Sequence, residues 1–124
     1  MKIRIKGNSI RFRLTKTEVE TFCRDGVYTE QTCFDNSTFN YQLTVKQGIM
    51  GLQAEFQNNT ITLLVPKEVA TVWAVSSKVG YENTITTKEG AQLHLLLEKD
   101  FVCMDQTTED QSDNYPNPKA NLQS

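Results

Sequence analysis

A chain of 124 residues fits one domain, and contents of 38% hydrophobic and 23% charged residues are typical of a globular protein. The net charge of −2 and the pI near 5.4 exclude a general attraction to nucleic acid or acidic membranes, so such binding needs a local basic patch. No apolar run is long enough to span a bilayer, and the charged start of the chain predicts neither a signal peptide nor a membrane contact.

The first predicted element is a β-hairpin. Charged and apolar residues alternate on both sides of Gly7-Asn8, a typical two-residue turn in which glycine accepts the positive φ of the first position. Pairing across this turn opposes Arg4 to Arg11 and Ile5 to Ile10. One face of the hairpin is then apolar, and the other carries five cations: Lys2, Arg4, Lys6, Arg11 and Arg13.

Two short helices are predicted further along the chain. Thr15 and Glu18 have the spacing of a capping box, in which each side chain satisfies a free backbone donor at the start of a helix. Val19 and Phe22 are expected on the buried face of this helix. The second helix is expected to begin at Pro66, a residue suited to a first helical position. Its predicted apolar stripe is Val69, Val72 and Trp73.

The sequence resembles itself at a spacing of about 50 residues. The matched apolar positions are Ile5 with Phe56, Ile10 with Ile61, Phe39 with Leu93, Tyr41 with Leu95 and Leu43 with Leu97. A polar stretch, Glu30-Gln31-Thr32, matches Glu82-Asn83-Thr84. Each half therefore reads strand, turn, strand, short helix, strand, strand, and one such half has too little core to stand alone.

We therefore predict an α+β fold: a single duplicated domain over residues 1–104, with halves at about 1–48 and 50–104. The halves are expected to be related by a pseudo-twofold axis, in a mostly antiparallel barrel or sandwich with two short helices. Residues 105–124 are polar and acidic, and we expect a disordered tail or an extended arm held through Tyr115 and the prolines beside it.

The cationic face of the first hairpin is the main candidate site. Five like charges on one small sheet face repel one another and call for compensation. An anionic ligand, an acidic protein surface or a nucleic-acid backbone would supply it, and so would Glu98 and Asp100 or the acidic tail within the chain itself. Nucleic acid is not favoured, because the chain as a whole is acidic.

The remaining reactive side chains give weak signals. Glu98 and Asp100 are predicted to share a strand face, where salt bridges to the basic hairpin are favoured over acid–base catalysis. Cys103 lacks a nearby histidine to activate it, since His94 is the sole histidine. The three cysteines, Cys23, Cys33 and Cys103, are expected to be reduced thiols, and no CxxC pair indicates zinc. We expect no enzyme activity, cofactor or metal.

Two resemblances add to this interpretation. The segments Gly7-Asn8-Ser9-Ile10-Arg11-Phe12-Arg13-Leu14, Glu98-Lys99-Asp100-Phe101 with Cys103, and Tyr115-Pro116-Asn117-Pro118 resemble a family of small bacterial proteins of unknown function, which implies a bacterial cytoplasmic setting. Locally, Gly7-Asn8-Ser9 and Val65-Pro66-Lys67-Glu68-Val69 are similar to the swapped-hairpin domains of AbrB and MazE-type antitoxins. That second resemblance implies a barrel formed from two halves, and DNA binding.

The sequence thus predicts a non-enzymatic binding or interaction module whose ligand it does not identify. The alternative is a DNA-binding regulator of the swapped-hairpin type that uses the basic first hairpin. The second half departs from that pattern, because its equivalent face carries Gln53, Glu55, Gln57, Thr62 and Leu64. A homodimer is left open.

Overall fold

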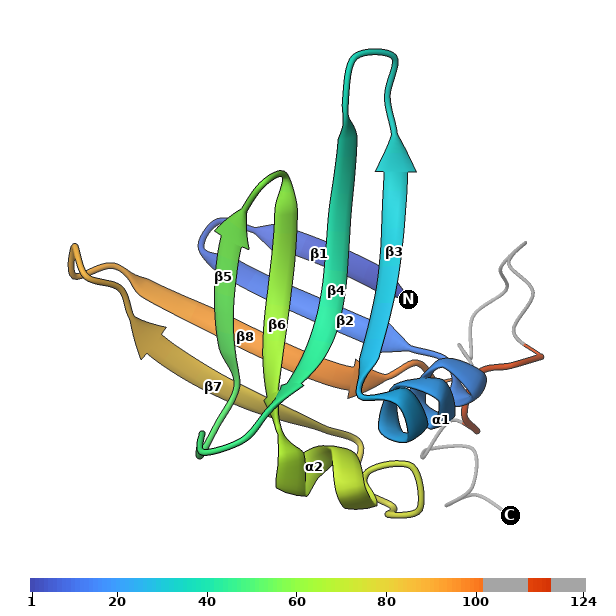
Figure 1. Ribbon diagram of the computed structural model, residues 1–124. Helices are drawn as coiled ribbons and strands as arrows, with labels where there is room; N and C mark the ends of the chain where they lie inside the picture. Colours follow the sequence, from blue (N-terminus) through green and yellow to red (C-terminus); the bar gives the residue numbers. More distant parts are fainter. Residues whose placement is uncertain (102–111, 117–124) are drawn as a thin grey trace.

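The computed structural model describes residues 1–101 and 112–116 (Figure 1). Its elements follow an order that repeats after the fourth strand, as predicted. The first half contains β1 (Lys2–Lys6), β2 (Ser9–Leu14), α1 (Lys16–Asp25), β3 (Val27–Cys33) and β4 (Thr38–Lys46). The second half contains β5 (Gln53–Gln57), β6 (Thr60–Pro66), α2 (Lys67–Val72), β7 (Gly80–Thr86) and β8 (Gln92–Lys99).

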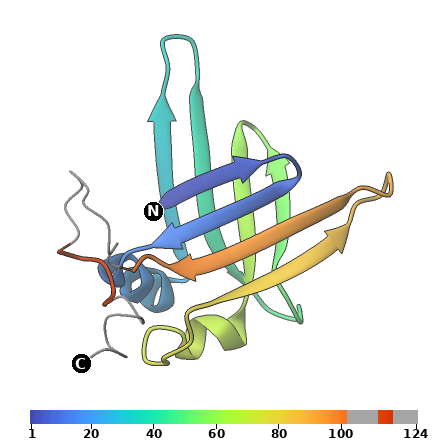
Figure 2. The same cartoon turned by 180° about the vertical axis from the view of Figure 1, so that it is seen from behind.

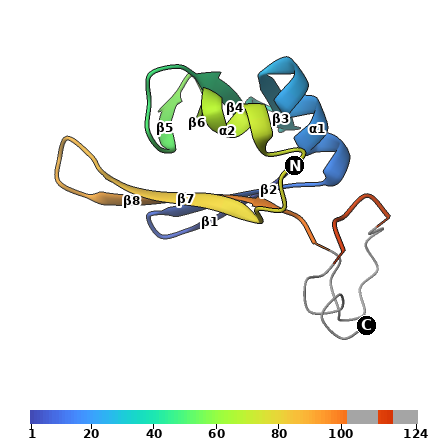
Figure 3. The ribbon, with the colours of Figure 1, turned by 90° about the horizontal axis from the view of Figure 1, so that it is seen from below.

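The strands of the described residues form two four-stranded sheets, each built from both halves. One sheet has the order β1-β2-β8-β7 and the other the order β3-β4-β6-β5. In each sheet an antiparallel hairpin of one half meets a hairpin of the other half, and the two inner strands run parallel. The sheets face each other and cross at a steep angle without closing (Figures 2 and 3). The fold is therefore the sandwich of the two predicted alternatives, and the barrel is wrong.

The pairing between the halves gives a structural measure of their equivalence. Ile10 lies opposite Leu95 in one sheet, and its sequence match Ile61 lies opposite Tyr41 in the other. The apolar positions matched in the sequence thus occupy equivalent places. The polar match is displaced by one residue: Glu30 pairs with Tyr41, whereas Asn83, and not Glu82, pairs with Leu95. Pairing register decides which face a side chain takes, so it overrides similarity of residue type.

The local predictions for the first half are confirmed. The first hairpin has the predicted register, including the pairs Arg4–Arg11 and Ile5–Ile10, and Gly7 has a φ of 55°. Helix α1 begins with the predicted capping box: Thr15 accepts from the backbone of Glu18, and the Glu18 carboxylate accepts from the backbone of Thr15. Its two predicted buried residues have no solvent exposure.

The second helix differs from its prediction in two details. Pro66 is the last residue of β6 and the N-cap of α2, so the helix itself begins one residue later. Val72 is 47% exposed, while Ala70 and Trp73 are 6% and 0% exposed. Residues three apart share a face of a helix. The buried face here is formed by Ala70 and by Trp73, the residue that follows α2.

The core lies between the two sheets and under the helices. It contains the inward side chains of the inner strands together with Val19 and Phe22 of α1 and Trp73 after α2. Both helices lie beside one end of the sandwich, and the turns β1–β2 and β5–β6 lie away from them (Figure 1). Among the described residues, no helix combines the length and the apolar composition needed to cross a membrane.

Residues 112–116 contact α1 and the end of β8. Asp113 accepts hydrogen bonds from the Thr17 hydroxyl (2.7 Å) and, through its carbonyl, from the Lys16 backbone (2.9 Å). Tyr115 donates its backbone N–H to the Asp100 carbonyl (2.8 Å), and its ring packs against Phe101. This part of the predicted arm is therefore held through Tyr115; the rest of it lies outside the described residues.

Candidate functional site

The cationic face of the first hairpin forms as its alternation predicts. In the antiparallel register of β1 and β2, Lys2 lies opposite Arg13, Arg4 opposite Arg11, and Lys6 opposite Ser9. Residues directly opposite on one sheet face have adjacent side chains. All five predicted cations therefore share the outer face of the sheet that contains β1 and β2.

Two carboxylates, both predicted from the sequence, lie against this face. Glu98 Oε1 is 3.1 Å from Arg11 Nε and 3.6 Å from Arg13 Nε, because the parallel register of β2 and β8 places Arg13 opposite Glu98. Asp100 Oδ2 is 3.4 Å from Lys2 Nζ. Among residues 1–101 and 112–116, these ion pairs compensate the face in part, since the two carboxylates contact three of its five cations.

The part of the face near the turn forms a shallow basic hollow. Arg4, Lys6, Ser9 and Arg11 line it, and its volume is about 260 Å³. Arg4 and Lys6 are exposed, and neither forms an ion pair with any residue of 1–101 or 112–116. The hollow thus has two free cations, a third shared with Glu98, and one hydroxyl donor.

The two carboxylates reach the cationic face from different places in the chain. Glu98 lies within β8, whereas Asp100 is the residue that follows the strand. Its backbone N–H donates to the Leu14 carbonyl (2.8 Å), which fixes it at the end of β2. Both carboxylates contact cations, an arrangement that suits charge neutralisation.

The acidic tail was a further predicted source of compensation. Asp113, its only acidic residue within the described range, lies at the start of α1 and hydrogen-bonds Thr17 rather than the basic hairpin. Hydrogen bonds from the side chains of Thr15 and Thr17 lower the pKa of Asp113. The other acidic residues of the tail, Asp105, Glu109 and Asp110, lie outside the described residues.

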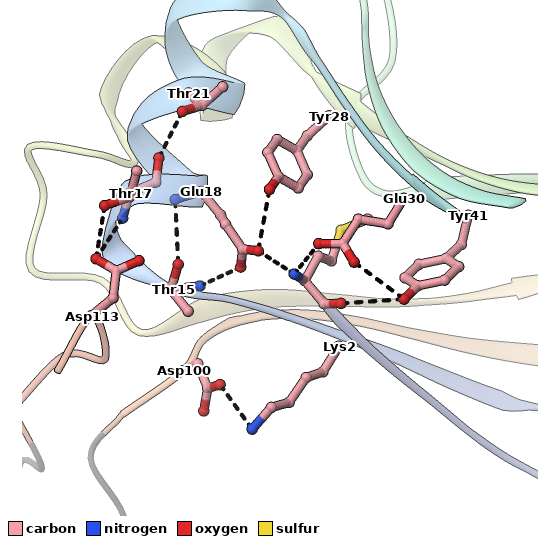
Figure 4. A network of polar contacts seen from close by, with 11 residues as sticks. Lys2, Thr15, Thr17, Glu18, Thr21, Tyr28, Glu30, Tyr41, Asp100 and Asp113 are labelled. Carbon is pink, nitrogen blue, oxygen red and sulfur yellow. Dashed lines mark hydrogen bonds and ion pairs between the residues drawn. The ribbon is translucent and has the colours of Figure 1, made fainter. Parts of the chain in front are cut away.

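A polar cluster that no local sequence pattern predicted surrounds the amino group of Met1 (Figure 4). The buried α-ammonium contacts the carboxylates of Glu18 and Glu30, which belong to α1 and β3. Tyr28 donates its hydroxyl to Glu18 (3.2 Å), and Tyr41 donates to the Met1 carbonyl (3.4 Å). The cluster therefore ties the edge of one sheet to the edge of the other.

Burial and charge shift the pKa values of this cluster. Burial alone would raise the pKa of Glu18, but hydrogen bonds from the α-ammonium and from the Thr15 backbone outweigh it and lower the pKa. Burial, followed by the charges of Glu18 and Glu30, raises the pKa of Tyr28 to about 12. The capping box marked Glu18 in the sequence, but nothing local indicated that Met1 and Glu30 would join it.

Neither Cys23 nor Cys33 lines the basic hollow, whereas His94 lies opposite Ser9 in the register of β2 and β8. Cys33 is exposed; burial raises the pKa of Cys23, which disfavours its thiolate. His94 Nδ1 is 2.7 Å from the Thr84 hydroxyl. The described residues contain no group of three or more side chains placed to hold a metal ion. Cys103, the predicted candidate nucleophile, lies outside the described range.

A second concave feature is an apolar pocket between the sheets, at the end away from the helices, with a volume of about 450 Å³. Most of its lining is three pairs of residues at equivalent positions of the two halves: Ile5 and Phe56, Ile10 and Ile61, Phe39 and Leu93. The sequence repeat contained all three pairs, but it did not indicate that they would line one pocket.

The chain can be compared with known proteins. A model for a family of unknown function, DUF7009, matches residues 1–119. The chain belongs to this family. The expected kinship with a family of unknown function is thereby confirmed. No curated protein and no solved structure shows significant similarity to the chain.

Proposed function

We propose that this protein is a non-enzymatic binding module that holds an anionic group in the basic hollow on the outer face of β1 and β2. The observation that carries the proposal is the pair of free cations, Arg4 and Lys6, beside Arg11 and the Ser9 hydroxyl. An oxyanion placed there accepts charge-assisted hydrogen bonds, which are about twice as strong as neutral ones. It also relieves the repulsion between neighbouring cations.

The ion pairs of the same face support a binding role over a catalytic one. Glu98 contacts two arginines and Asp100 contacts Lys2, so both carboxylates are engaged in ion pairs. The same pairs hold Arg11 and Arg13 in place beside the hollow. A preorganised arginine loses less entropy when it binds an anion.

DNA binding is the second candidate, favoured by one observation. The exchange of hairpins between the halves is the arrangement that the resemblance to swapped-hairpin domains implies. The charge distribution disfavours DNA binding, because the equivalent outer face of the second half carries Glu55 and uncharged residues. A protein that uses both halves of a pseudo-twofold on a duplex would need cations on both faces.

The proposal also covers the origin of the domain and its cellular location. We propose that residues 1–104 are one domain that arose by internal duplication, in a bacterial cytoplasmic protein. The equivalent pairing of Ile10 with Leu95 and of Ile61 with Tyr41 supports the duplication. The exposed free thiol of Cys33 suits a reducing compartment.

The test compares two double variants with the same net charge. Arg4→Gln with Lys6→Gln removes the two free cations, and Lys46→Gln with Lys88→Gln removes two exposed lysines elsewhere. Calorimetric titration with inorganic pyrophosphate, a polyglutamate peptide and a short DNA duplex identifies which anion binds. We expect pyrophosphate or polyglutamate to bind the wild type and the control equally, and the Arg4/Lys6 variant at least about tenfold more weakly.

Three outcomes would overturn the proposal. If none of these anions binds saturably, the proposal is wrong. If anion binding weakens equally in the Lys46/Lys88 control, only net charge matters. Binding of the duplex alone, with affinity that falls steeply as salt rises, favours the DNA-binding candidate instead.

A further inference from the structure

We propose that the apolar pocket between the two sheets binds a small uncharged hydrophobic molecule. The pocket lies on the inner side of the hairpin turns, so it is distinct from the basic hollow on the outer side of β1 and β2. It belongs to neither half alone. Ile5 and Ile10 come from one sheet, and Phe56 and Ile61 come from the other.

The mouth of the pocket exposes apolar surface. Ile5 is 53% exposed and Phe56 is 67% exposed, although both lie on the strand faces that point to the core farther along. The next residues inward, Phe12 and Leu63, are fully buried. Removal of apolar surface from water is favourable, so an occupant that covers Ile5 and Phe56 gains a driving force for binding.

The shape of the pocket favours a small molecule over a flat partner surface. Its volume of about 450 Å³ falls in the range of sites that hold small ligands. Its walls come from both sheets, and the half-buried Phe39 and Leu93 line it together with the more exposed Ile5 and Phe56. A flat protein surface would cover Ile5 and Phe56 at the rim and leave the recess unfilled, without contacts to Phe39 or Leu93.

The chemistry of the lining favours an uncharged ligand. The lining residues are hydrocarbon or aromatic except for Glu55, and none of them is a cation. A buried anionic group would have no partner in this lining, and burial of an unpaired charge is costly. The ligand is therefore an aliphatic or aromatic molecule without a charge in the recess.

The decisive experiment is a fluorescence titration with Nile red, an uncharged hydrophobic dye. The wild type is expected to bind one dye molecule saturably. Phe56→Ser removes a wall of the pocket, and its matched control is Phe34→Ser, since Phe34 is 62% exposed in the β3–β4 turn. Ala54→Leu fills the recess without exposing new surface. We expect Phe56→Ser and Ala54→Leu to weaken dye binding at least about tenfold, and Phe34→Ser to leave it unchanged.

The same variants define the results that overturn the proposal. An equal loss of dye affinity in Phe34→Ser would show that the dye adheres to any exposed aromatic side chain. Absence of saturable binding to the wild type would remove the site. Sedimentation of the dye-free protein as a dimer that Phe56→Ser converts to a monomer would show that a second copy of the chain covers this face instead. The Arg4/Lys6 variant should bind the dye normally, which separates this site from the anion site.

Discussion

At the scale of single residues, Glu18 shows how one side chain serves two purposes. It closes the capping box of α1 through the Thr15 backbone, and it pairs with the buried α-ammonium of Met1. The first purpose is local and readable in the sequence. The second depends on β1, α1 and β3 meeting in space, and it places a charge pair at the join between the sheets.

Replacement of Glu18 by Gln separates these two purposes. Glutamine still completes a capping box, but it removes the negative charge beside a buried ammonium. We expect Glu18→Gln to lower the free energy of unfolding by roughly 2 kcal/mol. The loss is smaller than for a buried charge that loses every partner, because Glu30 still pairs with the α-ammonium of Met1. Urea denaturation at neutral pH measures this, with Glu20→Gln on the exposed side of α1 as the control.

The pH dependence checks the cause of that effect. Folding lowers the pKa of Glu18 below its ordinary value of 4.5, so ionised Glu18 stabilises the folded state above that pH. This stabilisation is lost as the pH falls through the lower pKa of the folded state. The stability difference between wild type and Glu18→Gln should therefore be full at neutral pH and shrink in acid. A difference that is constant with pH would point to packing rather than charge.

At the scale of elements, the segment 112–116 covers the end of β8. The Tyr115 ring lies over the buried Lys99 amine, 4.9 Å from the ring centre, and Lys99 donates to the Ser76 carbonyl (2.7 Å). Burial lowers the pKa of Lys99. The Tyr115 hydroxyl is buried without a hydrogen-bond partner among the described residues. The ring therefore stabilises this contact, and its hydroxyl does not.

Two substitutions at Tyr115 have opposite expected effects. Tyr115→Phe removes an unsatisfied hydroxyl and should leave stability unchanged or raise it by about 1 kcal/mol. Tyr115→Ala removes the ring from Lys99 and Phe101 and should lower stability by about 3 kcal/mol. Thermal unfolding of both variants gives the answer. If Tyr115→Phe lowers stability as much as Tyr115→Ala does, the hydroxyl has a partner and the ring alone does not stabilise the contact.

At the scale of the whole molecule, the exchange of hairpins makes the two halves one folding unit. Neither sheet can form from a single half, because each inner pair, β2 with β8 and β4 with β6, joins the two halves. Pairs so distant in sequence form only when both halves are present. The sheets should therefore unfold together.

This cooperativity can be measured with one core variant in each sheet. Leu95→Ala and Leu43→Ala each remove a fully buried side chain and should cost about 2–5 kcal/mol. Fluorescence of Trp73, the only tryptophan, and far-UV circular dichroism should give the same midpoint in each variant. Separate midpoints in Leu43→Ala, with the Trp73 signal retained, would show that the sheets unfold independently.

The features that the sequence predicted correctly are local. Alternation around Gly7-Asn8 determined the register and the two faces of the first hairpin, and Thr15 with Glu18 determined the start of α1. These features depend on neighbours a few residues away, so a short segment contains all the information. Val72 was misassigned because a six-residue helix has too few positions for its periodicity to define a face.

The combination of the hairpins and the surface that they leave open depend on long-range packing. No local pattern states that β2 pairs with β8 or that Glu30 is equivalent to Asn83, since parallel pairing across the chain is set by packing of the apolar faces. Alternation correctly placed Ile5 and Phe56 on inner strand faces. Whether an inner face is covered depends on how the two sheets pack, and here they leave a pocket lined by both residues.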